Sequence, residues 1–247
     1  MSTLDTAKIR SLLGFDLDIR AKRITGSTND DLKTLSAEKR ILRPIVLFAE
    51  KQTTGRGRQG RSFYSEDGLY MSLLFPTLGE EAAFLTHIAA VAVAEAIREV
   101  TKLSARIKWV NDVYLDDKKV CGILTESVLR EGRRSYVLGI GINIGTPKGL
   151  LPSELLGKIA YFEGDKEALA AAILRGVFRR IEHHDLTRLR EDYASLSFLT
   201  GKTVRVIQGE KEEAATVTGL SPRLGLYVRY HNGEEQELIA GEVHLKI

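Results

Sequence analysis

The chain has 247 residues, enough for one large domain or for a domain of ordinary size with a small second one. Lys and Arg number 36 against 33 Asp and Glu, and the net charge of +3 is too small to indicate a dedicated nucleic-acid-binding surface. A single cysteine, Cys121, excludes an intramolecular disulfide framework and a multi-cysteine metal site. Because no apolar stretch is long enough to span a bilayer and the N-terminus lacks a secretion signal, the sequence predicts a cytoplasmic protein.

Cap residues and apolar periodicity predict the elements of the first hundred residues. Ser27 and the acids that follow it indicate a helix beginning near residue 27. Continuous apolar runs at residues 44–50 and 69–75 are typical of buried strands, and residues 51–67 between them form a loop rich in Gly, Arg and Ser. Residues 81–100 repeat apolar positions every 3.6 residues and predict a helix.

Short strands dominate the middle of the chain. Residues 105–109 predict a strand, and residues 113–115 and 120–129 flank a turn, as in a hairpin. Residues 135–144 return as a further strand, and the short connections favour antiparallel pairing of these last three segments. Residues 165–197 return to helical periodicity.

From residue 200 the pattern changes to short strands separated by turns. The best single boundary is therefore near residue 199, between a large domain, 1–199, and a small domain, 200–247, which has the size of an SH3-like barrel. The expected fold class is α+β, with a mixed, largely antiparallel sheet flanked by helices. The tail strands are predicted at residues 202–207, 214–220, 224–231 and 236–239.

Residues 55–61, Gly-Arg-Gly-Arg-Gln-Gly-Arg, are the strongest local signal for binding. Glycines allow the backbone to approach a ligand closely, and arginines present fixed forks that match phosphate or carboxylate. The alternative is a flexible basic loop for RNA, but such segments usually repeat within disordered sequence. This segment occurs once between two apolar strands, which favours an anion-binding loop.

Three other segments carry polar groups whose structural explanation is as good as a functional one when each is taken alone. Residues 108–112, Lys-Trp-Val-Asn-Asp, present charge at a sheet edge, but also suit an Asx-turn with Trp109 in the core. Lys119 precedes an apolar strand containing Gly122, although a lysine near a hairpin turn is commonly just solvated. Residues 27–29, Ser-Thr-Asn, suit a helix N-cap, where donors also meet small polar ligands.

Structural roles are expected for Cys121 and for the consecutive histidines His183 and His184, rather than catalytic or metal-binding ones. Cys121 lies in an apolar strand and is expected in the core. His183 and His184 end a predicted helix, where a cation complements the helix dipole, and neither has metal-ligand spacing to another histidine. Dedicated metal ligands are therefore not predicted.

Taken together and in order, these segments resemble the biotin protein ligases over roughly residues 25–145. The resemblance is specific because the basic glycine loop occurs together with the Lys-Trp-x-Asn-Asp element. Val110 stands where the family typically has proline, and Phe63 where relatives often have tryptophan. The motifs that carry it are Ser-Thr-Asn at 27–29, Gln52 followed by residues 55–61, Lys-Trp-Val-Asn-Asp at 108–112, Lys-Val-Cys-Gly-Ile-Leu at 119–124, and Gly-Ile-Gly-Ile-Asn at 139–143.

The resemblance implies a two-step reaction. Biotin and ATP, with Mg²⁺, would form biotinyl-5′-AMP and pyrophosphate, and the biotin would then pass to a lysine of a biotin carboxyl carrier protein. It also implies a class II synthetase-like catalytic domain with a small C-terminal SH3-like β-barrel. No dedicated metal ligands are implied, since Mg²⁺ arrives with ATP.

Carried over position by position, the resemblance assigns roles to individual residues. Asp112 has two candidate roles, one in receiving the acceptor lysine and the other in holding Mg²⁺, and the sequence does not choose between them. The implied catalytic residues are Arg58, Lys119 and Asp112; the biotin-binding residues are Ser27, Thr28, Asn29, Gln52, Arg56, Gly57, Arg58, Lys119 and Gly122; the ATP-binding residues are Arg58, Arg61, Lys108, Asn111, Asp112 and Asn143.

Three alternative functions follow from the same residues. A lipoate-protein ligase would share the fold, but the Gly-Arg loop and the Lys-Trp-x-Asn-Asp element favour biotin. A biotin-responsive repressor needs a DNA-binding unit before Ser27, and only 26 residues precede it, so no nucleic-acid partner is expected. An RNA-binding protein using the tail is disfavoured because residues 200–247 carry six Lys or Arg and seven Glu.

Two further expectations concern assembly and motion. The family resemblance allows a homodimer through the central sheet, for which residues 135–144 would offer an edge. The loop at residues 51–66 is long, glycine-rich and charged, which suggests that it closes over a bound adenylate and keeps water away. No membrane partner is expected.

Overall fold

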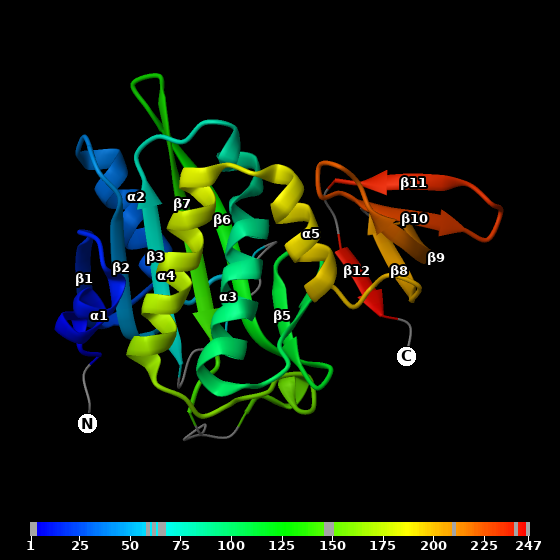
Figure 1. Cartoon of the computed structure of the whole chain (residues 1–247), viewed down its shortest axis with the longest axis horizontal. Coiled ribbons are helices and arrows are strands. Elements are labelled where there is room, and N and C mark those ends of the chain that lie inside the picture. Colours follow the sequence, from blue (N-terminus) through cyan, green and yellow to red (C-terminus); the bar gives the residue numbers. More distant parts are fainter. Residues whose placement is uncertain are drawn as a thin grey trace.

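A seven-stranded sheet flanked by helices forms the main body of the molecule, and a smaller sheet lies to one side of it (Figure 1). The structure is a computed structural model that describes residues 4–57, 60, 63, 68–145, 151–208, 211–239 and 242–245. The strands lie in the order β1-β2-β3-β7-β6-β5-β4. They are β1 (Asp18–Thr25), β2 (Ile45–Gln52), β3 (Leu69–Phe75), β4 (Arg106–Lys108), β5 (Asp112–Leu115), β6 (Lys118–Arg130) and β7 (Arg133–Ile142).

The sheet is mixed and largely antiparallel. Only β1 and β2 pair in parallel, and the remaining neighbours are antiparallel, including the predicted β5–β6 and β6–β7 pairs. The expected mixed sheet flanked by helices is thus confirmed. The prediction that residues 135–144 offer a sheet edge is wrong, because β7 pairs with β3 on one side and β6 on the other. The edge strands are β1 and β4.

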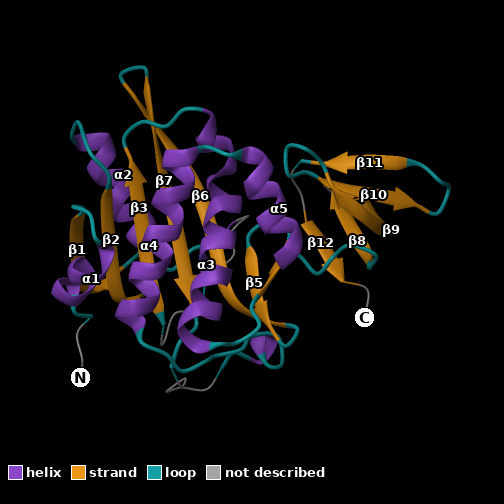
Figure 2. Ribbon diagram, viewed as in Figure 1, coloured by secondary structure: helices purple, strands orange, loops and turns teal. Residues whose placement is uncertain are grey.

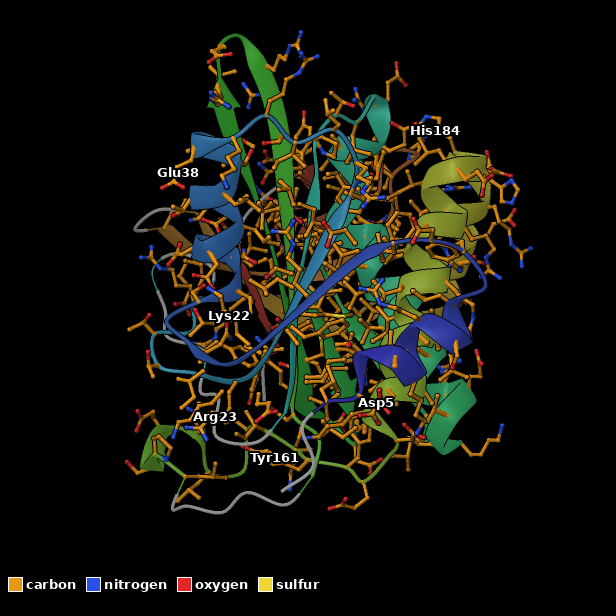
Figure 3. All side chains as sticks on the ribbon, turned by 90° about the vertical axis from the view of Figure 1, so that its left-hand side faces the viewer. Asp5, Lys22, Arg23, Glu38, Tyr161 and His184 are labelled. Carbon is orange, nitrogen blue, oxygen red and sulfur yellow. The ribbon has the colours of Figure 1, made fainter. Side chains whose placement is uncertain are left out.

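Helices cover the two faces of this sheet unequally. Helices α1 (Thr6–Leu13), α3 (Leu85–Thr101) and α4 (Lys166–His183) pack on one face, and α2 (Thr28–Glu38) packs on the other, as the side view in Figure 3 shows. The α3 sequence is rich in Ala, Val and Ile and is buried almost all round, since it lies between the sheet and α4. The main core therefore sits on the α3 face, and a much smaller apolar cluster lies under α2.

Most predicted elements are present, with shifts at their ends. Ser27 caps α2 as expected, and the predicted strand at residues 69–75 coincides with β3. The helical segment at 165–197 is two helices, α4 and α5 (Leu186–Leu196), because His184 is left-handed and Asp185 caps the second. Neither helix α1 nor strand β1 was predicted from the sequence. Cys121 is buried in the core as predicted, and burial raises the pKa of its thiol.

The last residues form a small antiparallel sheet beside α5 (Figures 1 and 2). Its strand order is β11-β10-β9-β8-β12, and in the part of the tail that the structure describes the outer strands β11 and β12 are not paired with each other. The sheet is therefore small and not closed, which leaves the barrel a proposal. Its strands are β8 (Thr203–Gln208), β9 (Lys211–Leu220), β10 (Leu226–Tyr230), β11 (Glu235–Leu238) and β12 (Glu242–Leu245).

The small sheet joins the main core through buried contacts near Leu224. Trp109, which lies in the core as the structural explanation expected, donates from Nε1 to the Leu224 carbonyl oxygen at 2.9 Å. His87 on α3 packs edge-on against the Tyr193 ring of α5, with centroids 5.3 Å apart. Burial lowers the pKa of His87 to about 4, and this effect exceeds that of the nearby Leu224 backbone, which raises the pKa. His87 is thus a neutral core residue near neutral pH.

Among the described residues, no helix combines the length and apolar character needed to cross a bilayer.

His87 predicts an acid-sensitive stability. An unfolded histidine takes up a proton near pH 6.5, but the buried His87 does so only near pH 4, so the folded state loses stability as pH falls through this window. We expect His87 to account for about 2 kcal/mol of the stability lost between pH 7.5 and pH 5. Urea unfolding of His87→Gln at both pH values should show a correspondingly smaller loss than the wild type.

The exposed His231 supplies the matched control. His231→Gln should keep the wild-type pH dependence, and an unchanged pH dependence in His87→Gln would contradict the assignment.

Candidate functional site

A pocket lies on the α2 face of the large sheet, at the N-terminal end of α2. Segments from six places in the chain line it, and these include nine of the residues predicted for the site. The predicted residues are Ser27, Thr28, Asn29, Gln52, Arg56, Gly57, Asn111, Lys119 and Gly122; the pocket also includes Phe63, Met71, Ile123, Leu124, Gly139, Ile140 and Gly141.

Glycines create the space for this pocket. Along β7, Leu138 and Ile140 belong to the main core, so the alternating pleat turns Gly139 and Gly141 toward α2. Gly122 stands opposite Gly141 on β6. A Cβ on Gly141 would lie 2.8 Å from the Phe63 ring, and one on Gly139 would collide with the Asn29 amide. The sheet therefore leaves a hollow where side chains would otherwise fill the layer.

A buried hydroxyl network holds the start of α2 above the hollow. The Thr28 backbone N–H donates to Gln52 Oε1 at 2.9 Å, and Thr28 Oγ1 lies 3.1 Å from the same oxygen. Fully buried Ser72 on β3 places its Oγ 2.7 Å from Thr28 Oγ1 and 2.6 Å from Asn29 Oδ1. Helix α2 is thus joined to β2 and β3 by polar contacts at the point where the apolar packing ends.

The proton count of this network leaves an oxygen for a ligand. Ser72 has one hydroxyl proton for two neighbouring oxygens, those of Thr28 and Asn29. If it donates to Asn29 Oδ1, the single Thr28 proton can go either to Ser72 or to Gln52 Oε1; if it donates to Thr28, the Thr28 proton goes to Gln52 Oε1 and Asn29 Oδ1 receives none from Ser72. Either arrangement leaves acceptor capacity at the pocket wall, which suits a ligand carrying N–H groups.

A chain of charges continues from Asn29 to the glycine-arginine loop. Asn29 Nδ2 donates to Glu126 Oε2 at 2.8 Å, and the other carboxylate oxygen accepts from Lys33 at 2.6 Å. Lys33 also pairs with Asp30 at 2.9 Å, and Asp30 pairs with Arg56 Nε at 3.0 Å. The charged side chains of this chain of charges are 24–60% exposed, so each ion pair adds little stability, whereas the hydrogen bond from the buried Asn29 amide to Glu126 adds more.

Lys119 and Asp112 form a second charged group, 2.7 Å apart. Lys119 lies at the pocket, where its Nζ would come 3.2 Å from a Cβ on Gly122, so the missing side chain gives the ammonium its space as expected. Asn111 donates from Nδ2 to the Ile123 carbonyl oxygen at 2.9 Å. Burial, with a smaller contribution from the Asp112 charge, raises the pKa of Tyr114 and of Tyr193. Both phenols are therefore neutral.

Among the described residues predicted for the site, Lys108, Asp112 and Asn143 do not line the pocket. Lys108 lies 5.8 Å from the centroid of the Tyr114 ring, and Asn143 is buried just beyond β7, with its backbone N–H donating to the Val120 carbonyl oxygen. Arg58 and Arg61 lie outside the described residues, as does much of the loop expected to close over an adenylate.

Sequence reasoning missed Ser72, Lys33 and Glu126 as parts of the site. Ser72 carried a signal, because it is the only small polar side chain in the strand Leu69–Phe75, whose other residues are aliphatic or aromatic. Lys33 and Glu126 carried none, since each occurs among polar residues on an exposed-looking segment, and only the fold brings them within 2.6 Å.

A larger cavity of about 410 Å³ lies between α3, α4 and α5, on the other face of the sheet. Its buried cation is already paired, because Arg180 contacts Glu95 at 2.6 Å and Asp192 at 2.8 Å. Within the described residues, no group of three or more His, Cys, Asp or Glu side chains is arranged to hold a metal ion.

Comparison with known proteins defines the class. The model of the biotin/lipoate A/B protein ligase family matches residues 21–143, which hold every residue of the pocket. The chain is 30% identical over 202 residues to the biotin–[acetyl-CoA-carboxylase] ligase of Mycobacterium tuberculosis, covering 77% of this chain and 74% of that protein. The chain belongs to the biotin protein ligase family.

Two further relatives differ in extent. The bifunctional ligase/repressor BirA of Bacillus subtilis is 42% identical over 115 residues, which span 44% of this chain but only 35% of that protein. The biotin protein ligase of Aquifex aeolicus, solved in complex with biotin and ATP, superposes with a TM-score of 0.78 at 28% identity, covering 93% of this chain and 98% of its own.

Glu126 predicts a measurable contribution to stability through Asn29 and Lys33. Glu126→Ala removes the acceptor for both donors, and we expect the free energy of unfolding to fall by about 1–3 kcal/mol in urea denaturation. Glu131→Ala at the tip of the same hairpin removes an exposed carboxylate and should stay within about 0.5 kcal/mol of wild type. Equal effects of the two substitutions would argue against the network.

Proposed function

We propose that this protein is an ATP-dependent biotin protein ligase, which forms biotinyl-5′-AMP and transfers biotin to a specific lysine of a biotin carboxyl carrier protein. The observation that carries the proposal is the glycine-floored pocket at the start of α2, which collects nine residues at positions matching the family's motifs. Membership of the biotin protein ligase family supports it.

The polar wall of the pocket suits a cyclic urea. The ureido ring of biotin has two N–H donors and one carbonyl acceptor, so its site needs acceptors and donors in a fixed arrangement. Thr28, Asn29 and Ser72 supply oxygens, and both hydrogen bonds of Gln52 end on its Oε1, which leaves its Nε2 protons for a ligand. Ser27, Arg56, Gly57 and Gly122 complete the proposed biotin site. A site of this kind rejects acids that lack the ring, because its own polar groups would lose their partners.

The first step joins two anions. The biotin carboxylate oxygen attacks the α-phosphorus of ATP, a new P–O bond forms, and the bond to the β-phosphate oxygen breaks to release pyrophosphate. Fixed positive charge lowers the barrier to such an approach, and no protein nucleophile is required. Lys119 is proposed to supply that charge at the pocket together with Arg58, and its partner Asp112 holds the ammonium in place.

The nucleotide is proposed to lie beyond Lys119, toward Arg61, Lys108, Asn111, Asp112 and Asn143. Mg²⁺ commonly takes most of its ligands from phosphates and water, with one or two carboxylates. Asp112, the carboxylate paired with Lys119, fits such a role, and the ion would supply neutralisation of phosphate charge. No separate metal site is needed.

The second step transfers the acyl group. The neutral amine of the acceptor lysine attacks the carbonyl carbon of the adenylate, an amide bond forms, and AMP leaves. An ammonium must first lose a proton, and a carboxylate beside the entering amine favours its approach. Asp112 is the proposed residue, which makes its two candidate roles separable by step.

The finer architecture is also proposed. A class II synthetase-like catalytic domain would span residues 1–199, and residues 200–247 would complete an SH3-like barrel. A lipoate-protein ligase shares the family model, but the relatives compared above are biotin ligases. We place the activity in the cytoplasm, where carrier proteins are expected to be.

The decisive experiment compares biotin and lipoate as substrates in the same reaction. Incubation with ATP, Mg²⁺, a carrier domain and either biotin or lipoate should give a streptavidin signal with biotin and no modification with lipoate. Modification by lipoate alone would replace the proposal with its alternative.

Lys119→Gln predicts a loss of the first step. Without the ammonium, pyrophosphate release in the presence of biotin and ATP should fall by a factor on the order of a hundred. Lys118→Gln changes the neighbouring, exposed lysine at the hairpin turn and should leave the rate unchanged. A comparable loss in both variants would place the effect outside the pocket.

Asp112→Asn separates the two roles of this carboxylate. If it serves the acceptor lysine, transfer from preformed biotinyl-5′-AMP should slow by about tenfold or more while adenylate formation continues. Loss of adenylate formation with normal transfer would instead assign Asp112 to the nucleotide and its Mg²⁺. Single-turnover assays of each half-reaction measure the difference.

A further inference from the structure

Asp30, the third residue of α2, contacts the start of the glycine-arginine loop. Its Oδ2 lies 3.0 Å from Arg56 Nε, and its Oδ1 lies 2.9 Å from Lys33 Nζ. Arg56 lines the pocket and Asp30 does not. Asp30 therefore contacts a pocket residue from outside the pocket, as a residue that positions another one does.

The loop is weakly constrained at the point where Asp30 contacts it. Two residues before Arg56, the Thr54 backbone N–H still donates to the Gly26 carbonyl oxygen at 2.9 Å, which ties the chain to the residue preceding the cap of α2. Arg56 itself has a glycine on each side, and glycine leaves the backbone free to take many conformations. The ion pair with Asp30 therefore holds a long side chain that is 60% exposed to solvent.

Lys33 connects Asp30 to Asn29, which is a second pocket residue. Lys33 Nζ also lies 2.6 Å from Glu126 Oε1, and the other carboxylate oxygen of Glu126 accepts from Asn29 Nδ2 at 2.8 Å. Burial disfavours the charge of Lys33, but its hydrogen bonds to Asp30 and Glu126 outweigh burial and raise its pKa, so this side chain stays an ammonium. Asn29 and Arg56 are therefore attached to one network of alternating charges.

A network of this kind acts on a ligand through preorganisation. When binding has to order a free arginine, affinity falls because the side chain loses its rotamer freedom at that moment. A partner that holds the arginine beforehand removes this cost from the binding step. The pair of Asp30 and Arg56 adds little to folding stability because both side chains are partly exposed, so a defect in ligand binding can be measured in a stable protein.

We propose that Asp30 is a positioning residue for biotin, which orders Arg56 at the pocket before the ligand enters. This inference rests on the proposed function. Asp30 is not among the residues proposed for the phosphate chemistry, so it acts on the binding of biotin and leaves the reaction rate of the bound complex unchanged.

Asp30→Asn tests the role with a side chain of the same shape and no charge. In single-turnover assays of adenylate formation, the half-saturating biotin concentration should rise about threefold to fivefold, which is within the range expected when binding has to order one long side chain. The maximal rate and the half-saturating ATP concentration should equal wild type. Asp30→Glu keeps the carboxylate and should restore most of the affinity for biotin. An unchanged half-saturating biotin concentration in Asp30→Asn would overturn the proposal.

Asp31→Asn is the matched control. Asp31 is the next residue of α2, and its carboxylate lies 2.6 Å from Thr25 Oγ1 and 2.9 Å from the ammonium of Lys22, which is labelled in Figure 3. The substitution removes the same charge from the same helix turn, at a residue that does not line the pocket. It should leave the half-saturating biotin concentration unchanged. Equal rises in Asp30→Asn and Asp31→Asn would mean that charge at the start of the helix acts in place of the contact with Arg56, and would refute the positioning role.

A double substitution shows whether Asp30 acts through Arg56. If it does, Asp30→Asn/Arg56→Gln should have the same half-saturating biotin concentration as Arg56→Gln alone, because no guanidinium is left for the carboxylate to hold. Effects that multiply in the double variant would show that Asp30 acts by another route and would contradict the inference.

The remaining outcomes separate this inference from the proposed function. Biotin-dependent pyrophosphate release in the wild type, with normal biotin affinity in Asp30→Asn, refutes the positioning role and leaves the ligase intact. Absence of biotin-dependent pyrophosphate release in the wild type refutes the proposed function itself. A lower maximal rate in Asp30→Asn at an unchanged half-saturating biotin concentration would assign Asp30 to the reaction step and would also overturn the inference.

Discussion

The attachment of the first turn of α2 over Gly139 and Gly141 of the sheet is the constraint on which the site depends. Gly139 and Gly141 have no side chains, and Asn29 and Phe63 lie over them instead, so no apolar side chain from these two positions of β7 packs against this turn. Its position comes instead from Asn29, whose amide is held by Ser72 from β3 and by Glu126 from β6. Both the space of the pocket and the polar contacts at the start of α2 are therefore linked to the glycines at positions 139 and 141.

The two halves of α2 have different environments: one half packs on an apolar cluster of the sheet, and the other lines the pocket. From its middle onward, the helix packs Leu32 and Leu35 against a small apolar cluster on the sheet, made of Ile45, Leu47, Leu74 and Val137. Toward its N-terminal end, Ser27 caps the helix while Thr28 and Asn29 face the pocket. The apolar cluster fixes the axis of the helix, so the polar groups at its start need only be oriented.

Periodicity and cap chemistry predicted the elements that are locally encoded, and failed where pairing partners are distant. Strand β3 and the start of α2 follow from apolar runs and a cap. Strand β1 does not, because most of its side chains are exposed and it is held by parallel pairing with β2. Distant pairing also explains why the prediction of β7 as an edge strand was wrong. The neighbours of β7 are β6 and β3, and β3 lies more than 50 residues away in sequence.

For the site, the sequence identified residues whose chemistry is unusual in their context. A loop of glycines and arginines, or a lysine beside a glycine, stands out locally, and nine such predicted residues line one pocket. Lys33 and Glu126 do not stand out, because an ion pair between a helix and a strand 93 positions apart is a property of the fold. Local sequence patterns therefore identify residues that line the pocket more readily than residues that position those residues through distant contacts.

The small C-terminal sheet bears on the site through the turn that ends in Asp112. Trp109 is fixed by the Leu224 carbonyl oxygen, and the carbonyl of the next residue, Val110, accepts from Tyr193 on α5 at 3.2 Å. Asn111 is fixed from the other side by Ile123. With its backbone anchored on both sides, this turn can hold the Asp112 carboxylate against Lys119. The tail thus stabilises a turn of the proposed catalytic site without lining the pocket.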